Sequence, residues 1–109
     1  MKGFITILIS SFFATCAYSQ IVVTHFNSSW NDENDFDISK LKECTKEYIV
    51  ICNNQKLQEE HEIKSVPTVI VFEDNTEVQR YEGNIMMQLT CSRKSIQHVI
   101  DSVYLKRFE

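Results

Sequence analysis

One stretch of sequence decides the fold of this chain: Ile63-Lys64-Ser65-Val66-Pro67-Thr68-Val69-Ile70-Val71-Phe72. Its β-branched second half predicts a strand, and Pro67, the only proline, stands directly before that strand. Asp74-Asn75 follows, and both residue types tolerate the left-handed backbone of a tight turn. A further strand is expected at 77–81 and ends before Gly83. The stretch therefore predicts a β-hairpin introduced by a proline.

Upstream of the hairpin, the apolar pattern predicts two strands joined by a helix. Ile21–Phe26 and Tyr48–Cys52 are β-branched or aromatic runs. Between them, apolar residues recur at helical spacing from Asp35 to Tyr48. A short linking helix is expected near Gln55–Glu62. Strand, helix and strand in this order are typical of a right-handed parallel crossover.

Downstream of the hairpin, the spacing predicts a terminal helix from about Ser92 to Lys106. Its apolar stripe consists of Ile96, Val99, Ile100 and Val103. The expected class is α/β, a four-stranded mixed sheet in the order β-α-β-α-β-β-α, flanked by helices.

The N-terminus has the pattern of a secretory signal peptide. Met1-Lys2 is followed by an apolar run and then by small residues at Ala17 and Ser19. Cleavage after Ser19 would divide the chain into a signal peptide, 1–19, and a domain, 20–109, that is periplasmic or secreted. The alternatives are an uncleaved membrane anchor, for which the run is short of the roughly 20 residues required, and a lipoprotein anchored at Cys16. In each case the membrane is contacted through this segment.

Charge and cysteine count restrict the function further. The net charge is −4, and removal of Lys2 with the signal peptide makes it −5. The sequence has no basic run, so no nucleic-acid partner is expected. Three cysteines, Cys44, Cys52 and Cys91, would remain after cleavage, and the odd number leaves at least one thiol unpaired. Their pairing stays open. No zinc-ligand spacing occurs, and neither a metal nor a cofactor is expected.

The stretch from Ile63 to Gly83 resembles the second half of thioredoxins. The resemblance implies a cis peptide bond before Pro67, beside the active site, where Val66, Pro67 and Thr68 would pair with partner peptides. The first half is similar too, because Trp30 matches the family tryptophan that precedes the two active-site cysteines.

The chemistry of thioredoxins is missing from the matching positions. Asn31 and Asn34 stand where the family has its two cysteines, and His25 occupies the position of its buried acid. An amide cannot act as the attacking or resolving thiolate. The resemblance therefore implies a thioredoxin-like fold without the dithiol.

The function expected from this combination is redox-inactive binding of a protein or an extended peptide. The expected groove consists of Trp30, Val66, Pro67, Thr68, Gly83, Met86 and Met87. Adaptable methionines suit a binding surface; in the alternative interpretation, Ile85, Met86 and Leu89 close the core under the last helix.

Two other function classes stay open. One is an atypical thiol oxidoreductase that uses Cys91 or Cys52. Cys91 lies near the start of the last helix, where the thiolate is favoured, whereas Cys52 ends an apolar strand and is also consistent with a small buried hydrophobe. The other class is a structural component, including one of a virus particle.

Overall fold

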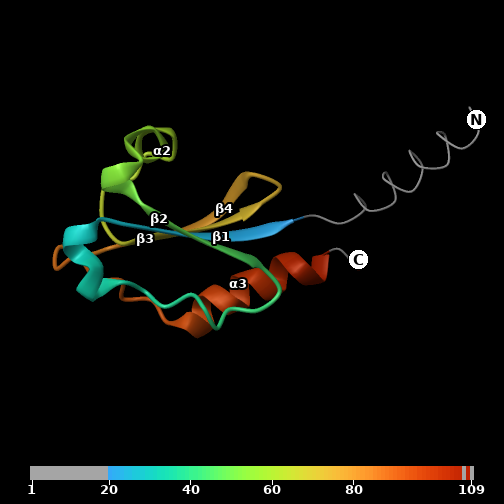
Figure 1. Cartoon of the computed structure of the whole chain (residues 1–109). Helices are drawn as coiled ribbons and strands as arrows, with labels where there is room; N and C mark the ends of the chain where they lie inside the picture. The colour runs from blue at the N-terminus through green and yellow to red at the C-terminus, as the bar shows by residue number, and fades with distance from the viewer. Residues whose placement is uncertain (1–19, 107, 109) are drawn as a thin grey trace, which may run out of the picture.

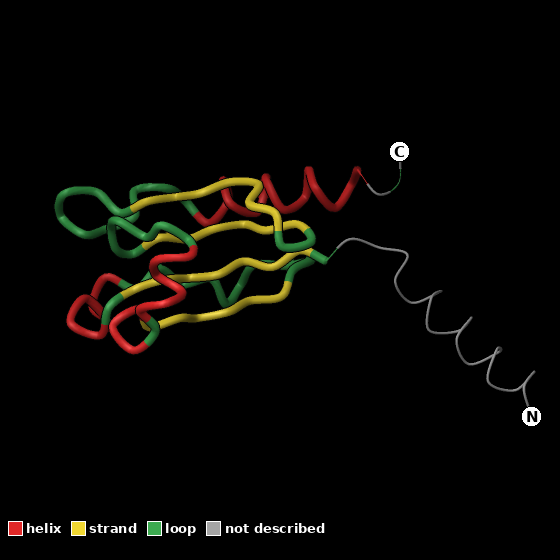
Figure 2. Tube along the Cα trace, turned by 90° about the horizontal axis from the view of Figure 1, so that it is seen from above, coloured by secondary structure: helices red, strands yellow, loops and turns green. Residues whose placement is uncertain are grey.

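The computed structural model describes residues 20–106 and 108. The predicted signal peptide and its cleavage site lie outside these residues, apart from Gln20. Four strands form one mixed sheet in the order β2-β1-β3-β4, with β2 and β4 at the edges (Figure 2). Their bounds are Ile21–Asn27 for β1, Thr45–Val50 for β2, Thr68–Glu73 for β3 and Thr76–Glu82 for β4. β1 is parallel to β2 and antiparallel to β3, which pairs antiparallel with β4.

The helical segments are short except for the last. Two 3-10 helices, η1 at Ser29–Asn34 and η2 at Ile51–Asn53, follow β1 and β2. The α-helices are α2 at Gln55–Glu60 and α3 at Arg93–Lys106. Among the described residues, no helix is both long enough and apolar enough to cross a membrane.

The hairpin, the linking helix and the terminal helix confirm the predictions. β3 and β4 cover the two expected runs, and the turn residues Asp74 and Asn75 have φ values of 50° and 67°. β3 lies in the middle of the sheet, and an apolar cluster covers each of its two faces, so nearly all of its side chains are buried. This explains why its sequence is a continuous apolar run rather than an alternating one.

The helix predicted between Asp35 and Tyr48 is wrong. Residues 35–44 form a loop, and β2 begins at Thr45 and ends at Val50, so Cys52 lies in η2 and not in a strand. The Asp37 carboxylate accepts a hydrogen bond from the Ser39 N–H, a local bond that competes with helix formation. Ile38 and Leu41 have helical spacing because both insert into the core from the loop.

Helix α3 lies on one side of the sheet and α2 on the other (Figure 1). The sheet separates two apolar clusters. On one face, α3 and the 35–44 loop cover the odd-numbered residues of β1 and β3; this cluster consists of Ile21, Val23, Ile38, Leu41, Val69, Val71, Ile96, Ile100 and Val103. The other face is covered from the side of η2 and α2; its cluster consists of Phe26, Ile51, Ile63, Val66, Ile70 and Phe72. Alternation along each strand sends neighbouring residues to opposite faces.

Candidate functional site

The candidate site lies at the end of the sheet where β1 and β2 finish. η1, η2 and the segment that joins β4 to α3 gather at this end (Figure 1). The Val66–Pro67 peptide bond is cis, as the resemblance implied. Pro67 and Thr68 are buried, and the Thr68 hydroxyl donates to the Ser65 carbonyl at 2.8 Å. These two residues therefore form the base of the site rather than its surface.

Gly83 is required by a close backbone approach. A Cβ atom at this position would lie 2.4 Å from the Val66 carbonyl oxygen and 3.1 Å from the Pro67 nitrogen. The obstructing atoms are backbone, so a side chain cannot be accommodated by a rotamer change. Gly83 thus positions the segment before Pro67 against the end of β4.

An apolar groove of about 420 Å³ opens beside this segment. Trp30 on one side is 64% exposed, and Ile85 on the other is 95% exposed. The lining residues are Ser28, Trp30, Ile51, Gln58, Ile63, Lys64, Ser65, Val66, Asn84, Ile85 and Met87. Lys64 is the single charged residue among them, so the groove suits an uncharged or apolar side chain.

The predicted groove residues are only partly brought together in this lining. Trp30, Val66 and Met87 line the groove, and Met86 is exposed beside it. The alternative in which Ile85 and Met86 close the core is wrong, because both are exposed. Leu89 does pack against the α3 cluster. The contribution of Ile51 and Ile63 was missed, since an apolar residue in a strand-like run gives no signal that it also faces a groove.

Asn31 occupies the centre of an amide network beneath the groove. It is 5% exposed, and its amide nitrogen donates to the Asn27 side-chain oxygen and to the Met87 carbonyl, each at 3.1 Å. Its own side-chain oxygen accepts from the Asn34 amide at 2.8 Å. The two asparagines at the predicted cysteine positions are therefore bonded to each other and to the opposite wall of the groove.

The wall of the groove opposite Trp30 is a tight loop, Asn84–Gln88, which we call the lip. The Asn84 side-chain oxygen accepts from the Met86 and Gln88 N–H groups at 2.8 and 3.2 Å. The Gln88 side chain donates to Asn34 Oδ1 at 3.2 Å, which adds a second tie to η1. Met87 has a φ of 60°, a conformation that exposes its carbonyl to Asn31. The lip is held by polar bonds rather than by packing of its apolar side chains.

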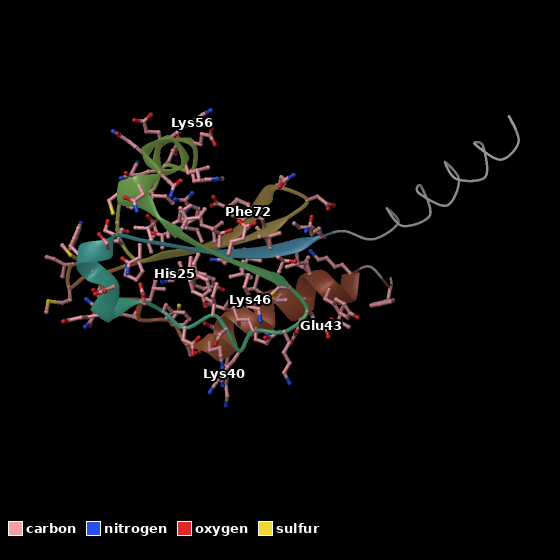
Figure 3. The ribbon with its side chains drawn as sticks, in the orientation of Figure 1. His25, Lys40, Glu43, Lys46, Lys56 and Phe72 are labelled. Atoms are coloured by element: carbon pink, nitrogen blue, oxygen red, sulfur yellow. The ribbon has the colours of Figure 1, made fainter. Side chains whose placement is uncertain are left out.

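His25 is buried between β1 and the start of the 35–44 loop (Figure 3 labels it). Its Nε2 accepts a hydrogen bond from the Phe36 N–H at 3.1 Å. Desolvation lowers the pKa of His25 below its usual 6.5, and the Asp35 carboxylate, 3.8 Å from Nε2, opposes this shift. The ring is therefore neutral near pH 7 and cannot assist a thiolate as a cation.

The lowered pKa of His25 predicts a loss of stability in mild acid. Below about pH 6.5 the unfolded chain binds a proton that the folded chain resists, so stability falls as the pH decreases. Urea midpoints measured between pH 8 and 5.5 should decline, and His25→Gln, which keeps an acceptor without a titrating ring, should flatten the decline. An equally steep decline in the variant would contradict the assignment.

The three described cysteines are all free, and their surroundings differ. Cys52 is exposed, with Sγ 3.3 Å from the Ser29 hydroxyl, and hydrogen bonding from Ser29 lowers its pKa. Burial raises the pKa of Cys91 and of Cys44. For Cys91 this direction is opposite to the one expected from its position before α3. The expectation that Cys52 is a buried hydrophobe is also wrong. Within residues 20–106 and 108, no group of three His, Cys, Asp or Glu residues could hold a metal ion.

Comparison with known proteins places this geometry in a known architecture. No protein-family model and no curated sequence relative matches the chain. Among solved structures, thioredoxin-2, a component of the malaria parasite protein secretion machinery, aligns with a TM-score of 0.62 at 17% identity, over 77% of this chain and 84% of that chain. A mutant thioredoxin from Halobacterium salinarum aligns with a TM-score of 0.59 at 19% identity, over 77% and 74%. The Fasciola hepatica thioredoxin gives 0.58 at 14%, over 85% and 89%.

Proposed function

On the thioredoxin-like fold that these comparisons show, we propose that the chain binds an extended segment of another protein in the groove between Trp30 and the lip, without dithiol chemistry. One observation carries the proposal. Asn31, at the position where the resemblance places the first cysteine, donates its amide to the Met87 carbonyl. The residue that would attack a disulfide in a thioredoxin here supports the wall of a groove.

The surface around the groove supports this proposal. Trp30, Ile85 and Met87 present exposed apolar area on both sides of it, and methionine adapts to ligands of different shape. Among the described residues, the Val66 N–H makes no hydrogen bond, which leaves it available to a peptide that adds as a strand. Apolar pockets beside a free backbone donor are the requirement for recognising an extended peptide.

The test uses fluorescein-labelled decapeptides with acetylated and amidated ends, rich in Leu and Phe, titrated with the protein and followed by anisotropy. Trp30→Ala should weaken the binding by at least roughly tenfold, because an exposed aromatic at the centre of an interface commonly contributes more than about 1.4 kcal/mol. Leu105→Ala, which removes an exposed apolar side chain on α3 outside the groove lining, is the matched control. Equal affinities of the two variants, or no peptide bound, would refute the proposal.

Cys52 is the basis of a second candidate function, a reactive single thiol. Its exposure and lowered pKa distinguish it from Cys91 and Cys44. We expect iodoacetamide at pH 7.5 to alkylate Cys52 first, as measured by peptide mass mapping over time. Ser29→Ala should slow that reaction, because it removes the hydroxyl bond that stabilises the thiolate. Faster labelling of Cys91 would exclude this candidate.

A further inference from the structure

β2 is an open and regular sheet edge. It pairs with β1 over six consecutive residues, and nothing in the described part of the chain pairs with its other side (Figure 2). Tyr48 and Val50 on this strand are 56% and 39% exposed. Regular edges with apolar side chains readily add another strand, because their outward N–H and C=O groups lack partners.

The protection that edge strands commonly carry is weak on β2. The strand contains no proline, and its register with β1 has no shift. Its lysine, Lys46, is turned toward the 35–44 loop, where the ammonium donates to the Ser39 and Leu41 carbonyls at 2.9 Å each. The Lys46 ammonium is therefore bound by the loop and protects the free edge less than an extended lysine would, and Glu47 is the other charged residue of the strand.

The other edge, β4, differs in these respects. Its register with β3 shifts at Val71/Phe72, an irregularity that distorts the outward hydrogen-bonding row. Arg80 on β4 pairs with Glu77 at 2.7 Å and also donates to the His61 and Glu62 carbonyls. Of the two edges, β2 is the better template for pairing.

We propose that a second copy of this chain pairs antiparallel with β2 about a two-fold axis, giving one continuous eight-stranded sheet. A two-fold axis perpendicular to the sheet leaves each side chain on the same face of the sheet. Residues directly opposite each other must therefore both be even-numbered or both odd-numbered, and one residue of β2 lies opposite its own copy, at the axis. An axis at Lys46 or Glu47 would place like charges directly opposite each other, which is destabilising. An axis at Ile49 would leave a shorter overlap.

An axis at Tyr48 satisfies both conditions. It sets Tyr48 against Tyr48 of the second copy, an aromatic pair, and Glu47 against Ile49 of the second copy. Lys46 then lies opposite Val50 of the second copy, on the face where Tyr48 contacts the His25 ring at a centroid distance of 5.5 Å. The overlap covers residues 46–50 from both copies, and no like charges are opposed.

This arrangement fixes where the two grooves lie. Each groove is at the end of the sheet where β1 and β2 finish, and antiparallel pairing places these ends on opposite sides of the dimer. The dimer would present two grooves that face apart, suited to joining two partners rather than to gripping one partner twice.

Sedimentation equilibrium of the purified protein tests the pairing. An edge of this length gives a small interface, so a dissociation constant on the order of 1–100 µM is expected. Val50→Lys places a lysine opposite Lys46 of the second copy and should raise this constant at least roughly tenfold. Val50→Thr, which keeps the β-branched shape, should change it by less than about threefold.

A cross-link tests the register independently. In air-oxidised protein, Tyr48→Cys should form a disulfide between the two copies at the substituted position, with oxygen as the oxidant, because residues on the axis bring their Cα atoms within the roughly 4.4–6.8 Å that a disulfide needs. Glu47→Cys should not cross-link to itself, because it faces Ile49 of the second copy. A monomer throughout the micromolar range, or a dimer that survives Val50→Lys and lacks this cross-link, would overturn the proposal.

Discussion

Replacing both Asn31 and Asn34 with cysteine is expected to give this chain a disulfide and a disulfide-reductase activity. The two side chains already meet, because Asn34 Nδ2 lies 2.8 Å from Asn31 Oδ1 across the three-residue spacing of η1. Trp30, the residue before Asn31, and Val66, the residue before Pro67, line the same groove, so a substrate in this groove would lie close to the new thiols. Turnover of insulin disulfides with dithiothreitol should rise at least roughly tenfold above that of the natural chain, since a thiolate and its resolving thiol supply the missing chemistry.

Two controls separate the chemistry from the structural change. Replacing Asn31 and Asn34 with serine breaks the same amide network without adding sulfur, and it should not raise turnover. The single Asn31→Cys variant has an attacking thiol without its resolving partner and should be trapped as a mixed disulfide. If the double cysteine variant folds, forms its disulfide and still turns over no insulin, the groove does not admit a disulfide substrate.

Asn31→Ala is expected to destabilise the protein strongly for a polar substitution. Asn31 is buried, and its loss leaves the Met87 carbonyl and the Asn27 and Asn34 side chains short of partners. A cost of about 2–4 kcal/mol follows from several buried polar groups left unsatisfied together with a small cavity. Urea unfolding measures this cost, and hydrogen exchange should show faster exchange of the lip amides than of the β3 amides.

Asn34→Ala is the matched comparison for that effect. Asn34 makes one bond to Asn31 and one to Gln88, and its surroundings are partly exposed. Water can replace these partners, so a loss of about 1 kcal/mol or less is expected. Equal losses for the two variants would show that the position of Asn31 under the lip has no special importance.

Local signals predicted most of the fold. The hairpin follows from the Asp74-Asn75 turn and the β-branched run after Pro67, and α3 follows from its apolar stripe. The 35–44 loop could not be predicted in this way, because Ile38 and Leu41 serve the core equally well from a loop. The spacing of apolar residues indicates which of them are buried. It identifies a helix only where the backbone N–H groups are free to form helical hydrogen bonds, and here the Ser39 N–H is bonded to Asp37 instead.

The candidate site was partly predictable for a related reason. Trp30 and Val66 were predicted through the resemblance. The sequence of the lip is consistent with either a groove or the core, because it does not show whether a methionine is exposed or buried. The bond from Asn31 to Met87 joins residues 56 apart, and only the fold brings them together. The role of Asn31 is therefore a tertiary property.

A second groove, lined by basic residues, also could not be predicted from the sequence, because only the fold brings its residues together. The groove has a volume of about 820 Å³. It is lined on one side by Lys40 and Lys42 of the 35–44 loop and by Lys46 of β2, and on the other by Arg93 and Lys94 at the start of α3 (Figure 3 labels Lys40 and Lys46). The sequence has no basic run because these residues come from two separate segments. Five of the eleven Lys and Arg residues of this acidic chain therefore line one groove, together with the acidic Glu43 and Asp101.

The contact at Gly83 has a consequence for how the chain tolerates mutation. Because backbone atoms stand 2.4 Å from where its Cβ would be, every other amino acid meets the same obstruction, whatever its polarity. In a saturation library selected for folded protein, position 83 should retain glycine alone, whereas exposed Ile85, two residues later, should accept most substitutions. Position 83 would then be invariant and position 85 variable. This pattern, two residues apart, would help to identify distant relatives whose overall sequence identity is too low to detect.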